Sequence, residues 1–196
     1  MRDADLADLV AATRELLSAV SLTDVPDEDL RQAAAEIRRI SAALSAARRS
    51  RVVRVPWPNG PLTGEVTGSA DPVLGRFNPV APPLQVTVDP SGSAYASLVP
   101  PPMYEGPRGA VHGGYSAMLL DAVMGTLVRA LGILAVTGKL TLRYLRPTPL
   151  DQTLHLSARV VSREGRKVTV DGEIRVGEVQ AVQSTGLFIV PSSWKQ

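Results

Sequence analysis

The chain has 196 residues, of which 44% are hydrophobic and 20% charged, and this composition suits one folded domain with an extension. The formal net charge of +2 and the 4% of aromatic residues argue against nucleic acid as a partner. The sequence has no cysteine and only His112 and His155 as histidines, so neither a disulfide framework nor a protein metal site is expected.

The first residues, "MRDADLADLV", are charged at once and lack the apolar core of a signal peptide. No apolar run reaches the roughly 18–20 residues that a membrane span needs. We therefore expect a soluble, cytoplasmic protein without a membrane span.

Residues 1–50 are predicted to form a helical extension of two amphipathic helices. The first carries apolar residues at helical spacing from Leu6 to Val20. The second follows Pro26 and an acidic first turn, which the helix dipole favours. It ends in a basic run, which we interpret as a solvated helix end, with contact to an anionic partner as the weaker alternative. The arginines of this run are Arg48, Arg49 and Arg51.

Residues 51–77 are rich in proline and glycine and are predicted to be a linker without long helices. Two strands, near 84–89 and 93–99, are expected to follow, joined by a Pro-Ser-Gly turn.

The main domain is predicted to span 78–196. After the two strands it has one long helix, from the stretch "GAVHGGYSAMLLDAVMG" to about Leu131, and then an antiparallel meander of four strands. One helix cannot cover both faces of such a sheet. The simplest arrangement is therefore an α+β fold in which a curved sheet wraps around the helix. Pairing two copies would cover the remaining edge strand. The four strands are expected within 133–147, 153–163, 167–176 and 178–190.

Asp121 lies in the middle of the apolar run of this helix. A lone carboxylate in such surroundings is costly unless it is paired or faces a cavity. A functional acid and a structural one, paired with Arg129 or a backbone turn, are both consistent with the helix alone.

The entrance of the helix is the tripeptide His112-Gly113-Gly114. Free backbone N–H groups point outward at a helix N-terminus, and the absence of side chains lets a substrate approach. Such an N-terminus stabilises the oxyanion that forms when a carbonyl is attacked. His112 is placed to orient the loop or to donate a hydrogen bond.

The spacing of these groups predicts a homodimer. Gly113 and Asp121 are eight residues apart, or about 12 Å along a helix. Catalytic contacts are nearer to about 3 Å. Two helices that lie antiparallel about a two-fold axis would bring Asp121 of one subunit to Gly113 of the other.

The stretches "VHGGYSAMLLDA" and "LTLRYLRPTPLDQTLHLSARVVSREGRKVTV" resemble the hotdog-fold acyl-CoA thioesterases of the phenylacetate-pathway type, over about residues 78–190. The resemblance implies the hotdog fold and hydrolysis of an acyl-CoA thioester. It implies that Asp121 is the nucleophile or general base, that the Gly113 N–H holds the carbonyl, and that His112 supports the site. Thr137 matches a position that helps to orient the water or the carboxylate, although it also suits an ordinary strand residue.

The resemblance implies no metal and no cofactor, since coenzyme A is part of the substrate. Where related enzymes often have Asn or Gln before the histidine, this chain has Glu105 and Arg108. Gly114 and several basic residues are candidates to bind the substrate and its phosphates. The basic candidates are Arg143, Arg146, Arg163, Arg166 and Lys167.

Two other functions are consistent with this pattern. The first is a non-catalytic acyl-CoA-binding or sensor protein that uses the helical extension as an interaction arm. The second, a hotdog dehydratase or hydratase, fits the spacing of His112 and Asp121 less well. A tetramer built through the extension is an alternative to the homodimer.

Overall fold

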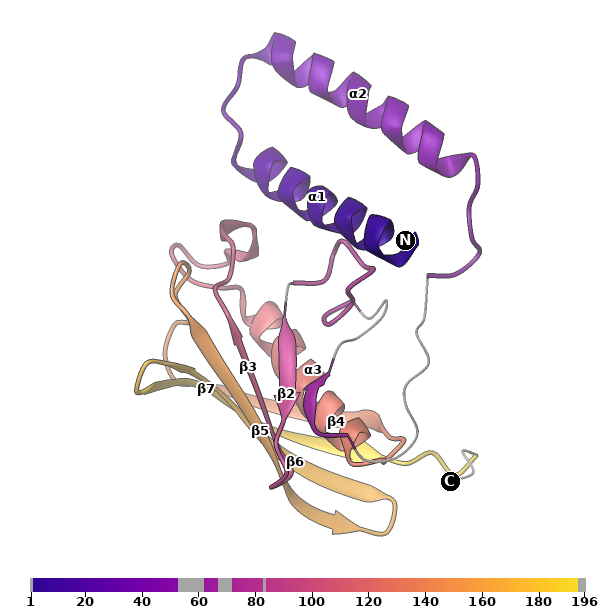
Figure 1. Ribbon diagram of the computed structural model, residues 1–196. Coiled ribbons are helices and arrows are strands. Elements are labelled where there is room, and N and C mark those ends of the chain that lie inside the picture. The colour runs from indigo at the N-terminus through magenta and orange to yellow at the C-terminus, as the bar shows by residue number, and fades with distance from the viewer. Residues whose placement is uncertain (1, 53–61, 67–71, 83, 194–196) are drawn as a thin grey trace.

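The computed structural model describes residues 2–52, 62–66, 72–82 and 84–193. Three α-helices and a sheet of seven strands make up the described chain (Figure 1). The helices are α1 (Arg2–Leu22), α2 (Asp27–Ser45) and α3 (Gly113–Ala130), with a short 3-10 helix η1 (Pro102–Tyr104). The strands are β1 (Gly64–Val66), β2 (Gln85–Val88), β3 (Ser93–Leu98), β4 (Val136–Tyr144), β5 (Leu154–Glu164), β6 (Lys167–Val176) and β7 (Val179–Ile189).

All seven strands belong to one antiparallel sheet in the order β1-β2-β3-β5-β6-β7-β4. The sheet curves around α3, as the sequence predicts (Figure 1). The predicted meander of four strands is wrong for β4, which pairs with β7 at the sheet edge and not with β5. The reason is that α3 carries the chain across the face of the sheet. The connection after β4 then returns beside the start of α3, where the Val111 N–H donates to the Thr148 carbonyl.

The hydrophobic core lies between α3 and the sheet. The inward side of α3 is fully buried, and Met124 on that side meets two glycines of the sheet. A Cβ atom at Gly172 would lie 3.1 Å from the Met124 sulfur, and one at Gly186 would lie 3.3 Å from it. The glycines therefore let the helix approach β6 and β7 closely. The buried side of α3 consists of Leu119, Leu120, Val123, Met124 and Leu127.

The helical extension is attached to the main domain through α1. Val10 is buried, and the Arg14 guanidinium donates from Nη2 to the carbonyls of Gly75 and Asn78, at 2.9 Å each. The other apolar residues predicted to line one face of α1 are largely exposed. Among the described residues, the contacts of α1 with the domain centre on this loop and on η1. None of the residues of α2 is buried, and α2 lies beyond α1, away from the sheet (Figure 1).

The predicted linker contains a strand. Residues 64–66 form β1, which pairs with β2 through Glu65 and Thr87. Much of the remaining linker, 53–61 and 67–71, lies outside the described residues. The boundaries at 50 and 77 stay a prediction.

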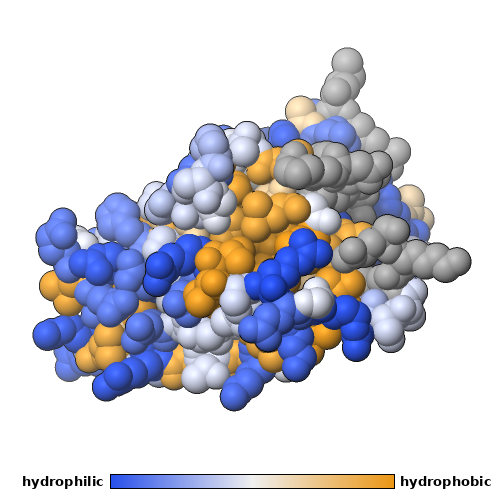
Figure 2. All heavy atoms as spheres, turned by 90° about the horizontal axis from the view of Figure 1, so that it is seen from below, coloured by the Kyte–Doolittle hydropathy of each residue, from blue (hydrophilic) through white to orange (hydrophobic). Residues whose placement is uncertain are grey.

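The strand β4 forms one edge of the sheet and is largely exposed along its length. Leu134 and Val136, before and at its start, are 44% and 45% exposed. Seen from below, hydrophobic residues form a band between hydrophilic ones (Figure 2). Apolar surface of this kind commonly marks an interface.

Replacing a core valine tests this packing. Val170→Ala removes two methyl groups from a side chain with no exposed surface, and we expect it to lower the free energy of unfolding by about 2 kcal/mol. The matched control is Val161→Ala in the neighbouring strand, where the side chain is 54% exposed. Urea denaturation measures both variants, and equal losses would contradict the described core.

Candidate active site

The start of α3 is held by its own N-cap residue. The Nδ1 atom of His112 accepts a hydrogen bond from the Gly114 N–H at 3.0 Å, and the His112 N–H donates to the Tyr104 carbonyl at 2.8 Å. Because Nδ1 is an acceptor, the neutral imidazole carries its proton on Nε2. Within the described chain, the Gly113 N–H donates to no acceptor. This amide is therefore available to an external ligand at the positive end of the helix dipole.

The two glycines of the entrance make room for side chains of the chain itself. A Cβ atom at Gly113 would lie 3.2 Å from Cζ of Tyr144, and one at Gly114 would lie 3.1 Å from Nδ1 of His112. The Tyr144 hydroxyl also donates to the Gly113 carbonyl at 2.8 Å. The sequence interpretation, that the glycines leave space for a substrate, misses these two neighbours.

Asp121 lies half-buried in the middle of α3, and Thr137 is its partner. The Thr137 hydroxyl donates to Oδ1 of Asp121 at 2.8 Å. The structure thus brings these two candidate residues together, and their catalytic roles stay a prediction.

A β-bulge places Thr137 on the correct face of the sheet. Thr137 pairs with Phe188 and Lys139 with Leu187, which leaves Gly138 as the extra residue. Strict alternation would put Thr137 on the face opposite Tyr144, but one inserted residue reverses this parity. Thr137 therefore points toward α3, where it meets Asp121.

Asp121 lies on the side of α3 that the sheet does not cover. The neighbours on this side are half-buried or exposed, and most of them are small or apolar. They include Gly114, Ala117, Met118 and Ala122. We call this the open side of α3.

Within one chain, the candidate residues form two separate groups at the two ends of β4. Tyr144 ends β4 beside Gly113, and Thr137 lies near its start beside Asp121. Gly113 and Asp121 are about 12 Å apart along the helix. One carbonyl therefore does not reach both groups of the same chain.

The basic candidates divide between the same two ends. Arg146 lies two residues after Tyr144 in the sequence and so belongs to the Gly113 end. Lys167 pairs with Ile189 of β7, and Thr137 pairs with the adjacent Phe188, so Lys167 belongs to the Asp121 end. Arg166, in the hairpin before β6, donates from Nη1 to the Val190 carbonyl at 3.2 Å. Arg143 faces away from α3, because it alternates with Tyr144 along β4.

Glu105, one of the two charged residues noted before His112, is engaged in its own loop. Its Oε1 accepts a hydrogen bond from the Gly109 N–H at 2.6 Å, and Gly109 has a φ of 74°. The carboxylate therefore stabilises the turn that leads to His112.

The sequence interpretation missed Tyr144, Tyr104 and Arg14. The rings of Tyr104 and Tyr115 stack with centroids 4.3 Å apart, and Arg14 of α1 interacts electrostatically with Tyr104. Burial and the neighbouring Tyr115 raise the pKa of Tyr104 to about 12, and Arg14 acts in the opposite direction. Leu140, Leu142 and Tyr144 occupy alternate positions of β4, so their side chains lie on the same face of the sheet. Because the two leucines pack on the core, this alternation could have indicated that Tyr144 faces α3.

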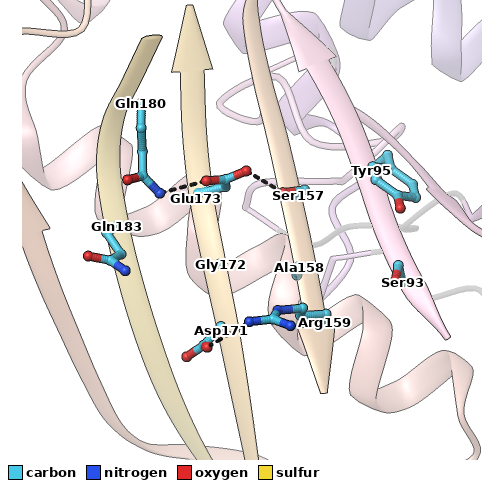
Figure 3. Close-up of a pocket in the computed structure, with 10 residues that line it drawn as sticks. All are labelled: Ser93, Tyr95, Ser157, Ala158, Arg159, Asp171, Gly172, Glu173, Gln180 and Gln183. Atoms are coloured by element: carbon cyan, nitrogen blue, oxygen red, sulfur yellow. Dashed lines mark hydrogen bonds and ion pairs between the residues drawn. The ribbon is translucent and has the colours of Figure 1, made fainter. Parts of the chain in front are cut away.

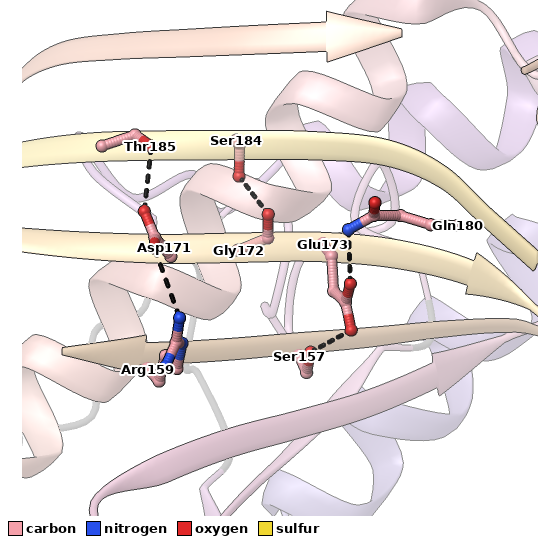
Figure 4. Close-up of polar contacts among 8 residues, drawn as sticks. All are labelled: Ser157, Arg159, Asp171, Gly172, Glu173, Gln180, Ser184 and Thr185. Carbon is pink, nitrogen blue, oxygen red and sulfur yellow. Dashed lines mark hydrogen bonds and ion pairs between the residues drawn. The ribbon is translucent and has the colours of Figure 1, made fainter. Parts of the chain in front are cut away.

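A polar hollow of about 350 Å³ lies on the sheet face that points away from α3 (Figure 3). Asp171 accepts a hydrogen bond from Thr185 and pairs with Arg159, and Glu173 accepts from Gln180 at 2.6 Å (Figure 4). Its carboxylates are thus engaged by neighbouring strands, and it contains none of the candidate residues.

The described residues contain no group of three metal-ligating side chains. Among the described helices, none combines the length and hydropathy needed to cross a membrane.

A long helix wrapped by an antiparallel sheet is the hotdog fold. A family model described as "Thioesterase superfamily" matches residues 108–182. The crystal structure of a thioesterase superfamily protein is 32% identical, with a TM-score of 0.83, and the match covers 94% of each chain. The chain therefore belongs to the thioesterase superfamily, which confirms the resemblance seen in the sequence.

Two further relatives match about half of the chain. A phenylacetic acid degradation-related protein from Ralstonia eutropha JMP134 is 28% identical with a TM-score of 0.51, over 55% of this chain and 85% of that one. Acyl-coenzyme A thioesterase THEM4 of Xenopus laevis is 35% identical over 92 residues, which are 46% of this chain and 41% of the relative. The chain thus matches less than half of the length of this curated relative.

The ionisation of Tyr104 gives a prediction for alkaline pH. A tyrosine unfolded in water ionises near its usual pKa of 10.0, whereas Tyr104 in the folded chain keeps its proton up to about pH 12. The stabilisation by this group is complete below pH 10 and is lost as the pH rises toward 12. We expect the free energy of unfolding of Tyr104→Phe to fall less steeply between pH 10 and 12 than that of the native protein. Tyr95→Phe, at an exposed site of the sheet, is the control. Denaturation at pH 9 to 12 measures both, and identical pH profiles for the native protein and Tyr104→Phe would refute the prediction.

Proposed function

We propose that the protein is an acyl-CoA thioesterase, which hydrolyses a thioester to a free acid and coenzyme A. The observation that carries the proposal is the pairing of two features on one helix. The Gly113 N–H at the start of α3 has no acceptor among the described residues, and Asp121 lies on the open side of α3 with Thr137 as its partner. Family membership and the acyl-CoA thioesterase relative support the same activity.

The reaction begins when the Gly113 N–H donates to the thioester carbonyl and stabilises the developing oxyanion. Thr137 donates to Oδ1 of Asp121, and the proposal gives the reacting role to Oδ2. In the general-base route, Oδ2 takes a proton from water while the water oxygen attacks the carbonyl carbon. The C–S bond then breaks, and the thiolate leaves and is protonated. In the nucleophilic route, Oδ2 attacks the carbon itself, the C–S bond breaks and the thiolate leaves, and water then hydrolyses the mixed anhydride to the free acid and the Asp121 carboxylate. No step uses a cofactor.

The active site is composite in this proposal, because Gly113 and Asp121 of one chain are too far apart. Two chains form a homodimer in which the open sides of α3 pack antiparallel, so that each Asp121 meets the Gly113 of the partner. The small and apolar residues of the open side support this packing. A tetramer built on the same dimer stays an alternative.

His112 holds the entrance through its bond to Gly114, and the exposed Gly114 borders the bound carbonyl. The phosphates of coenzyme A are bound by basic residues at the mouth of the site. In the antiparallel dimer, Arg166 and Lys167 lie at the Asp121 end of one chain, and Arg146 of the partner comes to that end with its Gly113. Arg143 is the weakest candidate, since it faces away from α3. A cytoplasmic location stays a prediction.

Removing the carboxylate tests the chemistry. We expect the native protein to release thiol from at least one acyl-CoA in a panel of chain lengths and aromatic acyl groups. Asp121→Asn should lower the rate by at least about 100-fold, because it abolishes the base or nucleophile. The control is Asp151→Asn, at a turn position with a φ of 59° that Asn also adopts. Undiminished release by Asp121→Asn would remove this residue from the mechanism, and saturable binding without release would favour a binding protein.

Mixing two inactive variants tests the composite site. Asp121→Asn lacks the acid, and Gly113→Pro lacks the donor N–H at the first helical position, where the backbone suits proline while the new ring presses on Tyr144. A mixed dimer has one site with both defects and one intact site. After subunit exchange at equal amounts, we expect about one quarter of the native rate, since half of the dimers are mixed. Recovery of no activity from two folded, exchanging variants would show that the site lies within one chain.

A further inference from the structure

The strand β4 contacts α3 through side chains at both of its ends. Thr137 donates to Asp121, and Tyr144 donates to the Gly113 carbonyl, at 2.8 Å in each case. The first contact belongs to the acid already assigned to the proposed reaction. The second contact reaches the residue whose N–H is the proposed oxyanion donor.

The peptide unit between Gly113 and Gly114 is held from two sides. Tyr144 donates to its carbonyl oxygen, and His112 accepts from its N–H at 3.0 Å. Two successive glycines at a helix end would otherwise be among the most mobile positions of the backbone. The Gly113 N–H belongs to the preceding peptide, whose carbonyl, that of His112, accepts from the N–H groups of Tyr115 and Ser116 at 2.9 and 3.3 Å. Gly113 is thus held on both of its sides, and Tyr144 supplies the contact on the following side.

The ring of Tyr144 lies against Gly113. Its Cζ and Cε1 atoms are 3.2 and 3.3 Å from the position that a Cβ atom at residue 113 would occupy. Gly113 is not among the glycines with positive φ, so its backbone conformation is open to alanine. The close contact with Tyr144 is thus the feature of the described chain that favours glycine here, since a Cβ atom would push the ring by a few tenths of an ångström.

We propose that Tyr144 is a positioning residue that aims the Gly113 N–H at the thioester carbonyl, and that its ring is the reason for glycine at position 113. The inference rests on the proposed thioesterase function. Tyr144 acts through the backbone of Gly113 and does not take part in bond formation. Loss of its hydroxyl therefore lowers kcat more than it changes KM, because the donor is needed most when charge develops on the oxygen.

The first test removes the hydroxyl and keeps the ring. Tyr144→Phe is expected to lower kcat by about 10-fold with little change in KM, which is less than the loss of about 100-fold or more that follows removal of an oxyanion donor. Tyr95→Phe, an exposed tyrosine on the outer face of the sheet, is the control and keeps the native kcat. An unchanged kcat in Tyr144→Phe would overturn the positioning role.

The second test combines changes at both positions. Gly113→Ala should lower kcat strongly in the native background, since the new methyl group displaces the ring. In a Tyr144→Val background, the same change should lower kcat by no more than about 2-fold relative to Tyr144→Val alone, because the obstacle is gone. Equal losses in both backgrounds would show that the substrate, and not Tyr144, requires glycine, and would refute the steric part of the inference.

The melting temperatures of the native protein, Gly113→Ala, Tyr144→Val and the double variant separate a failure of the steric inference from a failure of the proposed function. A steric contact predicts that Gly113→Ala lowers the melting temperature in the native background and much less in the Tyr144→Val background, where the ring is absent. If the native protein releases thiol from no acyl-CoA, the proposed function and the catalytic role of Tyr144 both fail, even when the two positions remain coupled in stability. Thiol release together with uncoupled stability and uncoupled kcat would overturn the inference and leave the thioesterase function standing.

Discussion

The packing of α3 against the sheet on one side only is the constraint on which the site depends. Leu120 and Met124 are buried against the sheet, and the glycines of β6 and β7 bring the helix close to it. The opposite side of the helix is left open, and Asp121 lies there. A carboxylate on the closed side would be isolated in an apolar core at high cost. On the open side it has a hydroxyl partner and remains accessible to a second chain.

The edge strand β4 adds precision to this arrangement. Its bulge at Gly138 turns Thr137 toward Asp121, and its last residue, Tyr144, packs on Gly113. The same strand thereby holds the proposed acid and the proposed donor at a set separation along α3. Because that separation exceeds the size of a carbonyl group, a rigid helix favours a site shared between two chains over one that closes within a chain.

The extension is joined to the same region through a short chain of contacts. Arg14 of α1 binds the loop before β2 and acts on Tyr104, whose ring stacks on Tyr115 and whose carbonyl accepts from His112. The helix entrance is therefore supported from α1 as well as from β4. The exposed apolar residues of α1 and the lack of buried residues in α2 show that the described fold does not cover these helices fully.

The sequence by itself determined the elements and most of the candidate residues. Local periodicity placed α3 and the strands β2 to β7 within a few residues but missed β1. Helical and strand patterns are visible in the spacing of neighbouring apolar side chains. The His112-Gly113-Gly114 entrance and Asp121 were found by the same local logic. Only the tertiary structure decided that β4 pairs with β7, that Gly138 forms a bulge, and that Tyr144 fills the space above Gly113. Strand partners and bulges depend on contacts between residues far apart in the chain. The alternation of apolar and polar residues along one strand does not indicate these contacts.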